Sequence, residues 1–416
     1  MLGSSGSIAL LRSREFRRLW AGDAATRLGY QATNFSLPMV AVTVLHANAF
    51  QVGTVSAAIS APVVALALLA GRVTRRLPSL LVACNVVRVS ALGILIAVNA
   101  ITGLRLAYLV VVAVIVGSAT VFYDIGCQTI IPQVVSTTMV VRAVAALQAV
   151  LSVTQLTGPA IAGFLLGETG PSIAVACIAA VFAFGAMNFS LLRSANHDVP
   201  KESDTRITVT DGLRFVFRTP VVRSICTLTG LLNLQQQAYL TVFTIYLVRT
   251  LGVSTGVAGM VLGAGALGAL IGSLTIGELA DRLRPGAAIS AGVTVAGAAL
   301  FLAGLVGISI GKQAPIALAA GFVVNGFAQA CCNVFMVGLR QVVPPPEFRP
   351  AVNATSRLAS YGPIPIGALI GGSLAGVAGS AHALLLVSGA MVLTSLYLFR
   401  SPLGRIRTMA DPAAVG

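Results

Sequence analysis

The chain consists of long apolar runs joined by short polar connections, from Leu19 to Phe399. A helix needs about 20 mainly apolar residues to cross the hydrocarbon core of a bilayer. The runs therefore predict an all-α membrane protein with six spans in each half of the chain. We place the twelve spans at residues 19–46, 49–70, 80–101, 106–131, 141–166, 171–192, 221–249, 256–279, 287–309, 315–340, 353–376 and 380–399.

Composition leads to the same class of protein. Hydrophobic residues make up 56% of the 416 residues and charged residues only 9%, whereas a soluble domain carries about 25% charged residues. A water-soluble protein of this size has no interior large enough for that much apolar surface, so a bilayer has to be the solvent. The net charge of +15 does not indicate nucleic-acid binding, because the arginines lie at the ends of apolar runs rather than in one patch.

The distribution of the 27 Lys and Arg residues predicts the orientation of the chain. If both termini are cytoplasmic, only Arg105, Arg249 and Lys312 fall in outer loops, and Arg27 and Arg88 fall within spans. Cytoplasmic loops carry the excess of basic residues in membrane proteins. We therefore expect a multi-pass protein with both termini in the cytoplasm. The strong preference for arginine over lysine suggests a GC-rich bacterium, and hence the bacterial inner membrane.

One connection is longer and more polar than the rest, between Arg193 and Pro220. We expect an N-terminal bundle at residues 1–193, a cytoplasmic linker at 194–219, a C-terminal bundle at 220–400 and a cytoplasmic tail at 401–416. The linker contains DGLRFVFRTP, in which Asp211 is placed to cap a short helix with an apolar side. Such a helix lies in the membrane interface.

The two halves also repeat short motifs in the same order. GRVTRRLP at residues 71–78 matches GELADRLRP at 277–285, and GPAIAG at 158–163 matches GPIPIG at 362–367. Each pair falls at the corresponding span or loop of its half, which predicts a duplication of six plus six spans.

These motifs are where a family resemblance becomes visible. The repeated loop resembles the G-x-x-x-D-R signature of the major facilitator superfamily, and GPAIAG resembles the glycine–proline motif found in its exporters. The segments REFRRLWAGD, VFYD and LRQVVPPPEFR resemble a drug-efflux branch that includes macrolide-efflux and enterobactin-export proteins. The resemblance implies two six-helix bundles of 3+3 repeats related by a pseudo-twofold axis, and transport by alternating access.

The resemblance also implies roles for motif residues. The gating loop would consist of Gly277, Asp281 and Arg282, whereas the first copy has Arg75 at the acidic position and Pro78 at the later glycine. The helix-bending motifs would be Gly158, Pro159 and Gly163 in the first half and Gly362 and Pro363 in the second. Ala113 stands nearest to the arginine that many proton-coupled drug antiporters carry in span 4, so proton coupling stays open.

Polar side chains form stripes on four spans. A polar group facing lipid is expensive, so such stripes face protein or a water-filled cavity. Spans 1, 4, 7 and 10, the first helices of each triplet, carry them, and in the superfamily these helices line the central cavity. The predicted cavity residues are Asp23, Arg27, Gln31, Asn34, Asp124, Gln128, Asn233, Gln236, Gln237, Tyr239, Asn325, Gln329 and Asn333.

Two interpretations of the charges within the spans stay open. Asp23 and Arg27 are one helical turn apart, and Arg88 and Asp124 are at similar depth, so two ion pairs would hold the first bundle together. Alternatively, Asp23 or Asp124 exchanges a proton or meets a cationic substrate. Arg340, near the end of span 10, is assigned a structural role.

The amides between Asn233 and Gln237 are too many at mid-membrane depth for all to face lipid, so at least one is expected to line the cavity. We predict a secondary active transporter that exports a hydrophobic, drug-like or natural-product molecule. A solute importer of the same fold and a non-transporting polytopic sensor are the alternatives. The expected partners are a small-molecule substrate, membrane lipid and, if the protein is proton-coupled, protons. We expect a monomer without cofactor, metal, nucleic acid or enzymatic activity.

Overall fold

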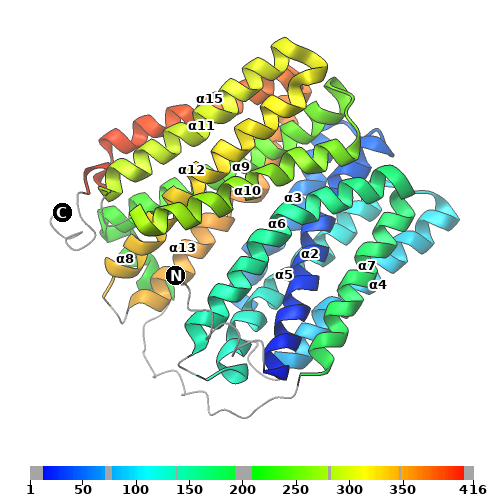
Figure 1. Cartoon of the computed structure of the whole chain (residues 1–416), viewed down its shortest axis with the longest axis horizontal. Helices are drawn as coiled ribbons and strands as arrows, with labels where there is room; N and C mark the ends of the chain where they lie inside the picture. Colours follow the sequence, from blue (N-terminus) through cyan, green and yellow to red (C-terminus); the bar gives the residue numbers. More distant parts are fainter. Residues whose placement is uncertain are drawn as a thin grey trace. The chain divides into compact units, whose positions relative to one another are not determined.

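The computed structural model describes residues 13–70, 77–136, 139–192, 209–279, 283–345 and 348–406, and this part of the chain contains helices and no β-strand. In the first half, six long helices follow one another (Figure 1). They are α2 (Arg14–Thr43), α3 (Ala49–Ala70), α4 (Leu77–Thr102), α5 (Leu106–Val134), α6 (Val140–Thr169) and α7 (Pro171–Ser190).

A short helix, α8 (Val209–Arg218), precedes the second half, in which α9 (Pro220–Ile245) continues into a π-helical turn at Tyr246–Thr250. The remaining helices are α10 (Thr255–Leu279), α11 (Pro285–Ile310), α12 (Ala314–Val342), α13 (Arg349–Tyr361), α14 (Pro363–Ala378) and α15 (Ser380–Arg400). Short 3₁₀ turns at Gly311–Gln313 and Pro402–Arg405 complete the described elements.

The predicted all-α membrane architecture is confirmed. Each predicted span coincides with one long helix, except that the eleventh consists of α13 and α14, which meet at Gly362. The linker helix begins at Val209, two residues before Asp211, so Asp211 lies inside its first turn and the predicted capping position is wrong.

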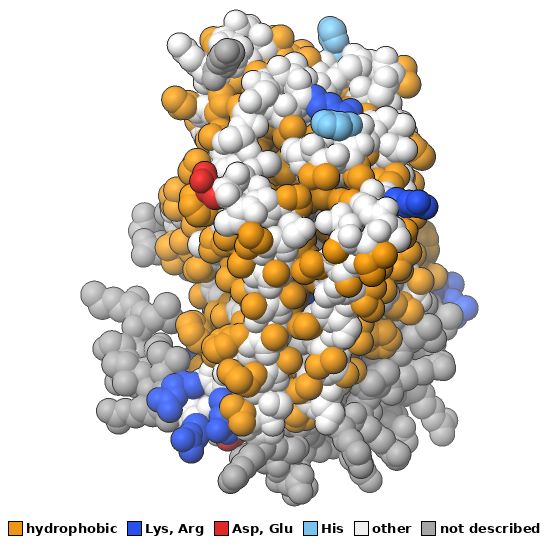
Figure 2. Space-filling view, turned by 90° about the vertical axis from the view of Figure 1, so that its right-hand side faces the viewer, with side chains coloured by type: hydrophobic (Ala, Val, Ile, Leu, Met, Phe, Trp, Pro, Cys, Tyr) orange, Lys and Arg blue, Asp and Glu red, His pale blue; other side chains and the backbone are white. Residues whose placement is uncertain are grey.

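Ten helices of the described chain are long and apolar enough to cross a membrane, whereas α2 and α9 are not among them. These two helices are the first of each half, and both carry a predicted polar stripe. Figure 2 shows the side on which α4 and α7 lie, where hydrophobic side chains spread over the middle and basic side chains lie towards the ends. An apolar middle with charged ends is the surface that a bilayer requires.

The helices group into two compact units, residues 1–46 with 58–203 and residues 47–57 with 204–416. In the first unit, α2 packs on α6 and α7, and α4 packs on α5 and α7. Glycines on α2 let the aromatic rings of α7 approach its backbone. A Cβ added at Gly22 would lie 2.7 Å from the ring of Phe189, and one added at Gly29 would lie 2.9 Å from the ring of Phe182.

In the second unit, α10 packs on α12, α11 packs on α12 and α15, and α9 packs on α14. Glycines of α10 make the first of these contacts possible. A Cβ at Gly268 would overlap the carbonyl oxygen of Val323, and one at Gly272 would lie 2.5 Å from that of Phe327. Lipid provides no hydrophobic driving force between helices, so such backbone approach supplies the van der Waals contact that holds them.

We predict that Gly268→Ala lowers the free energy of unfolding by about 1–3 kcal/mol, because the new methyl group forces α10 away from the α12 backbone. Thermal unfolding of the purified protein in detergent measures the loss. Gly93→Ala is the matched control, since a Cβ at Gly93 in α4 meets nothing within 4 Å. Equal stability of the two variants would contradict the assigned role of Gly268.

Candidate functional site

The carboxylate of Asp23 is the centre of a buried polar cluster in the first unit. Asp23 is 0% exposed and accepts hydrogen bonds from Nε of Arg27 on both oxygens, at 2.9 and 2.8 Å. Tyr123 Oη donates to Oδ1 of the same carboxylate at 2.8 Å, and Cys127 Sγ does so at 3.4 Å. The side chains on each helix are four residues apart, so both donors of α5 face the ion pair on α2.

This arrangement gives the carboxylate three different donor groups and no exposure to solvent. A buried charge is stabilised only when it is paired and hydrogen-bonded, and Asp23 meets both conditions. The predicted ion pair between Asp23 and Arg27 is present within α2, and the bonds from Tyr123 and Cys127 link it to α5. The Arg27 side chain remains 19% exposed.

Arg88 on α4 is the second buried charge, also 0% exposed. Its guanidinium donates to Thr120 Oγ1 at 2.9 Å and to Asn85 Oδ1 at 3.4 Å. It also lies over two aromatic rings, 5.2 Å from the ring centre of Tyr123 and 5.1 Å from that of Phe182. Cation–π contacts of this kind gain strength when water is excluded. Arg88 thereby ties α4 to α5 and α7.

The other stripe residues of the first unit are more accessible. Asn34 on α2 and Gln128 on α5 are exposed, whereas Gln31 and Asp124 are half-buried. Gln31 lies against α6, because a Cβ at Gly158 would approach its Cβ to 2.5 Å. The stripes thus divide into side chains that join helices and side chains that remain open.

The consecutive amides of α9 in the second unit also divide. Gln235 is buried and exchanges hydrogen bonds with Thr394 on α15, at 2.9 and 3.1 Å. Gln236 Oε1 accepts a hydrogen bond from Gln329 Nε2 on α12 at 3.1 Å. Asn233 Nδ2 donates to the carbonyl oxygen of Ser360 on α13 at 2.8 Å. These three amides of α9 therefore contact three different helices, namely α15, α12 and α13.

Gln237 is half-buried, and its side chain makes no hydrogen bond among the described residues. On α12, Asn333 is exposed, whereas Asn325 is buried and donates to the carbonyl oxygen of Ala296 on α11 at 3.1 Å. Gln329 lies between them in sequence and in exposure. The α12 stripe therefore runs from a helix-joining amide to an open one.

An aromatic cluster lies next to these amides. The ring of Tyr239 is stacked on that of Phe243, with centres 5.6 Å apart, and both rings contact Phe322 of α12. The Tyr239 hydroxyl is buried and has no hydrogen-bond partner in the described chain. A buried hydroxyl without a partner is unfavourable, so this position is a candidate for a polar contact from a ligand or a bound water.

The remaining motif residues are less completely described. Asp281 and Arg282 of the predicted gating loop lie outside the described residues, and Gly277 lies near the end of α10. Helix α6 continues through Gly158, Pro159 and Gly163, whereas Gly362 separates α13 from α14. The Nε atom of Arg340, at the end of α12, is buried without a described partner.

Sequence reasoning missed several members of the first-unit cluster. Tyr123 and Cys127 precede the predicted stripe residues Asp124 and Gln128 by one position each. Their own spacing of four residues was a usable signal, because it places a hydroxyl and a thiol on one face of the helix. Asn85 accepts hydrogen bonds from Arg88 on its own helix and from Thr26 on α2, and the contact with α2 had no signal in the sequence.

A family model described as transmembrane secretion effector matches residues 5–414. The chain belongs to this family of the major facilitator superfamily. An uncharacterized MFS-type transporter, y4rN of Sinorhizobium fredii, is 25% identical over 249 residues. That alignment covers 59% of this chain and 60% of the relative, less than two thirds of its length.

Comparison with solved structures shows the fold of this chain. The nucleoside transporter NupG is 14% identical, with a TM-score of 0.74 over 94% of this chain and 99% of the other. A bacterial homologue of the iron transporter ferroportin is 18% identical, with a TM-score of 0.71 over 93% and 98%. A D-xylose–proton symporter is 14% identical, with a TM-score of 0.70 over 95% and 98%. The predicted major facilitator fold is confirmed, and the chain is a multi-pass membrane protein.

We predict that Asp23→Ala lowers the free energy of unfolding by about 3 kcal/mol, since it leaves Arg27 and the α5 donors without their acceptor. Thermal unfolding in detergent measures the change. Asn34→Ala is the control on the same helix, and its exposed side chain should change stability by no more than about 0.5 kcal/mol. A small effect of Asp23→Ala would mean that the cluster does not hold α2 on α5.

Proposed function

We propose that this transporter exports hydrophobic, drug-like or natural-product molecules by alternating access. The observation that carries the proposal is the division of the polar stripes. Asn34, Gln128 and Asn333 are exposed within long helices, while other stripe residues, such as Asp23, Asn325 and Gln329, make contacts between helices. Because a polar side chain is unfavourable against lipid, the open amides of each unit are assigned to a water-accessible surface that a substrate can reach.

The character of the open side chains supports an apolar substrate. The open side chains are uncharged amides, which offer hydrogen bonds, whereas the charges of Asp23 and Arg88 are buried and already engaged. Ligand sites of this kind combine apolar surface with a few polar groups that fix orientation. The direction of transport is supported by the family description as a secretion effector.

We also propose that the chain lies in the bacterial inner membrane with both termini in the cytoplasm. Basic residues at the start of α2, in α8 and at the end of α12 lie at the ends assigned to the cytoplasm, and Arg105 before α5 and Arg249 after α9 lie at the opposite ends. This distribution is the one that the positive-inside rule requires.

The test of export uses proteoliposomes loaded with ethidium, a macrolide or a catecholate siderophore, with and without a pH gradient. Gln128→Leu is expected to reduce efflux severalfold at an unchanged protein level, because it removes an open amide of the pathway. Thr129→Val is the matched control, since Thr129 is the exposed neighbour on α5 and its hydroxyl donates to its own helix at Ile125. Gradient-driven uptake would indicate an importer. The absence of flux for all of the tested compounds would contradict the proposed export.

For proton coupling we propose Asp124 rather than Asp23. Asp124 is half-buried on the stripe face, whereas Asp23 is completely enclosed by its donors. Asp124→Asn is expected to abolish the stimulation of efflux by the pH gradient while leaving the protein folded. Retention of full stimulation in this variant would contradict the assignment without affecting the proposed substrate pathway.

A further inference from the structure

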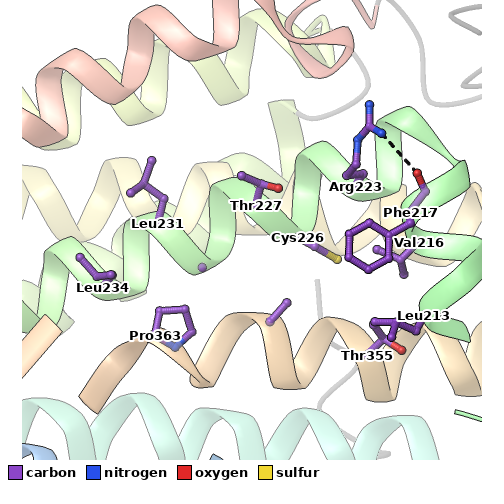
Figure 3. Close-up of a pocket in the computed structure, with 12 residues that line it drawn as sticks. Leu213, Val216, Phe217, Arg223, Cys226, Thr227, Leu231, Leu234, Thr355 and Pro363 are labelled. Atoms are coloured by element: carbon purple, nitrogen blue, oxygen red, sulfur yellow. Dashed lines mark hydrogen bonds between the residues drawn. The ribbon is translucent and has the colours of Figure 1, made fainter. Parts of the chain in front are cut away.

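A groove of about 370 Å³ lies within the second unit, between α8, α9 and the α13–α14 segment (Figure 3). Leucine, valine, phenylalanine, alanine and proline side chains make up most of its lining. The volume is at the small end of the roughly 300–1,000 Å³ that small-ligand sites occupy. The groove therefore accommodates a narrow apolar group rather than a large rigid molecule.

The groove has a cationic end and an apolar end. Arg223 lies near the start of α9 beside Phe217 of α8, whereas Leu231 and Leu234 lie two to three turns further along α9 (Figure 3). Leu234 lies eleven residues beyond Arg223, a distance of roughly 16 Å along the helix at the rise of 1.5 Å per residue. This length is about half of the ~30 Å hydrocarbon core, so the groove has the depth of one leaflet.

Helix α8 places the cationic end at the membrane interface. Val216 of α8 is buried in a cluster with Val222, Cys226 and Val352, and the ring of Phe215 stacks on that of Phe348 at 5.1 Å. Leu213 and Phe217 are exposed and line the groove together with Val216, whereas Arg214 and Arg218 are exposed on the opposite side of α8. An amphipathic helix with this pairing of residues lies at the boundary between headgroups and acyl chains.

At the membrane interface, the Arg223 guanidinium is able to bind an anion. It is exposed, and its described hydrogen bond is one of 3.3 Å from Nη1 to the carbonyl oxygen of Phe217. A guanidinium carries five N–H donors in a planar fork that suits a phosphate. Most of these donors are not used within the described chain, and Arg214 and Arg218 add to the local positive charge.

We propose that this groove binds one acyl chain of an anionic phospholipid, with the lipid phosphate on Arg223. The combination of a basic headgroup site and an apolar channel of leaflet depth matches a lipid, whereas a free anion would leave the channel empty. Assignment to the inner leaflet rests on the proposed orientation of the chain. The lipid site itself depends neither on that orientation nor on the direction of transport.

The test is native mass spectrometry of the full-length protein in mild detergent, with phosphatidylglycerol and phosphatidylcholine of identical acyl chains. The wild type is expected to retain phosphatidylglycerol in preference to phosphatidylcholine. Arg223→Gln should weaken phosphatidylglycerol binding about tenfold, since a charged hydrogen bond is lost, and Arg223→Lys should keep most of the preference. Thr227→Phe, which fills the groove from its exposed wall, should reduce retention of both lipids.

Arg142→Gln is the matched control, because Arg142 is an exposed arginine of the first unit. An equal loss in Arg142→Gln and Arg223→Gln would overturn the proposal in favour of general charge attraction, as would equal binding of the two lipids to the wild type. Inorganic phosphate is expected not to displace the lipid, and displacement would reassign Arg223 to a simple anion site. Loss of ethidium efflux in Thr227→Phe with unchanged lipid retention would make the groove a substrate entry instead. Gel filtration of each variant confirms that it is folded.

Discussion

Polar side chains inside apolar helices have to find partners within the protein, and both halves of this chain are organised around that constraint. In water, an amide or carboxylate without a protein partner still forms hydrogen bonds with the solvent. In hydrocarbon, the same group loses the full free energy of its hydration. The Tyr123–Asp23 bond, the enclosed Arg88 and the Gln235–Thr394 pair each join different helices. Polar contacts specify which helices are neighbours, and glycine contacts set how closely they approach.

The two halves satisfy the constraint with different chemistry. The first unit uses charges, with a carboxylate and two guanidinium groups among aromatic rings. The second unit uses amides, hydroxyls and backbone carbonyls, as in the bonds of Asn233 and Asn325. A charged cluster is lost almost entirely when one member is removed, whereas amide bonds are weaker and more independent. The duplicated fold is therefore stabilised unequally in its two copies.

The spans were predictable because each one is recognised by its mean hydropathy over about 20 residues, which a single polar residue changes little. The prediction placed α4, α5 and α15 within a few residues of their observed ends. Partners of individual polar residues were not predictable. Asn325 and Gln329 share one stripe and one spacing, yet the first contacts the α11 backbone and the second contacts Gln236. Which contact a residue makes depends on how the helix is rotated and on which helix lies next to it. The periodicity within one helix gives no information on either.

The weak hydropathy of α2 and α9 has a consequence for biogenesis. These helices are the first of their halves, and neither is apolar enough to qualify as a span on its own. The hydrogen-bond partners of their polar residues, such as Tyr123 on α5 and Thr394 on α15, belong to helices that are synthesised later. Each leading helix thus leaves the translocon with unmatched polar groups and acquires its partners from downstream helices. Membrane integration of each half is accordingly a cooperative event that is completed only when the later helices arrive.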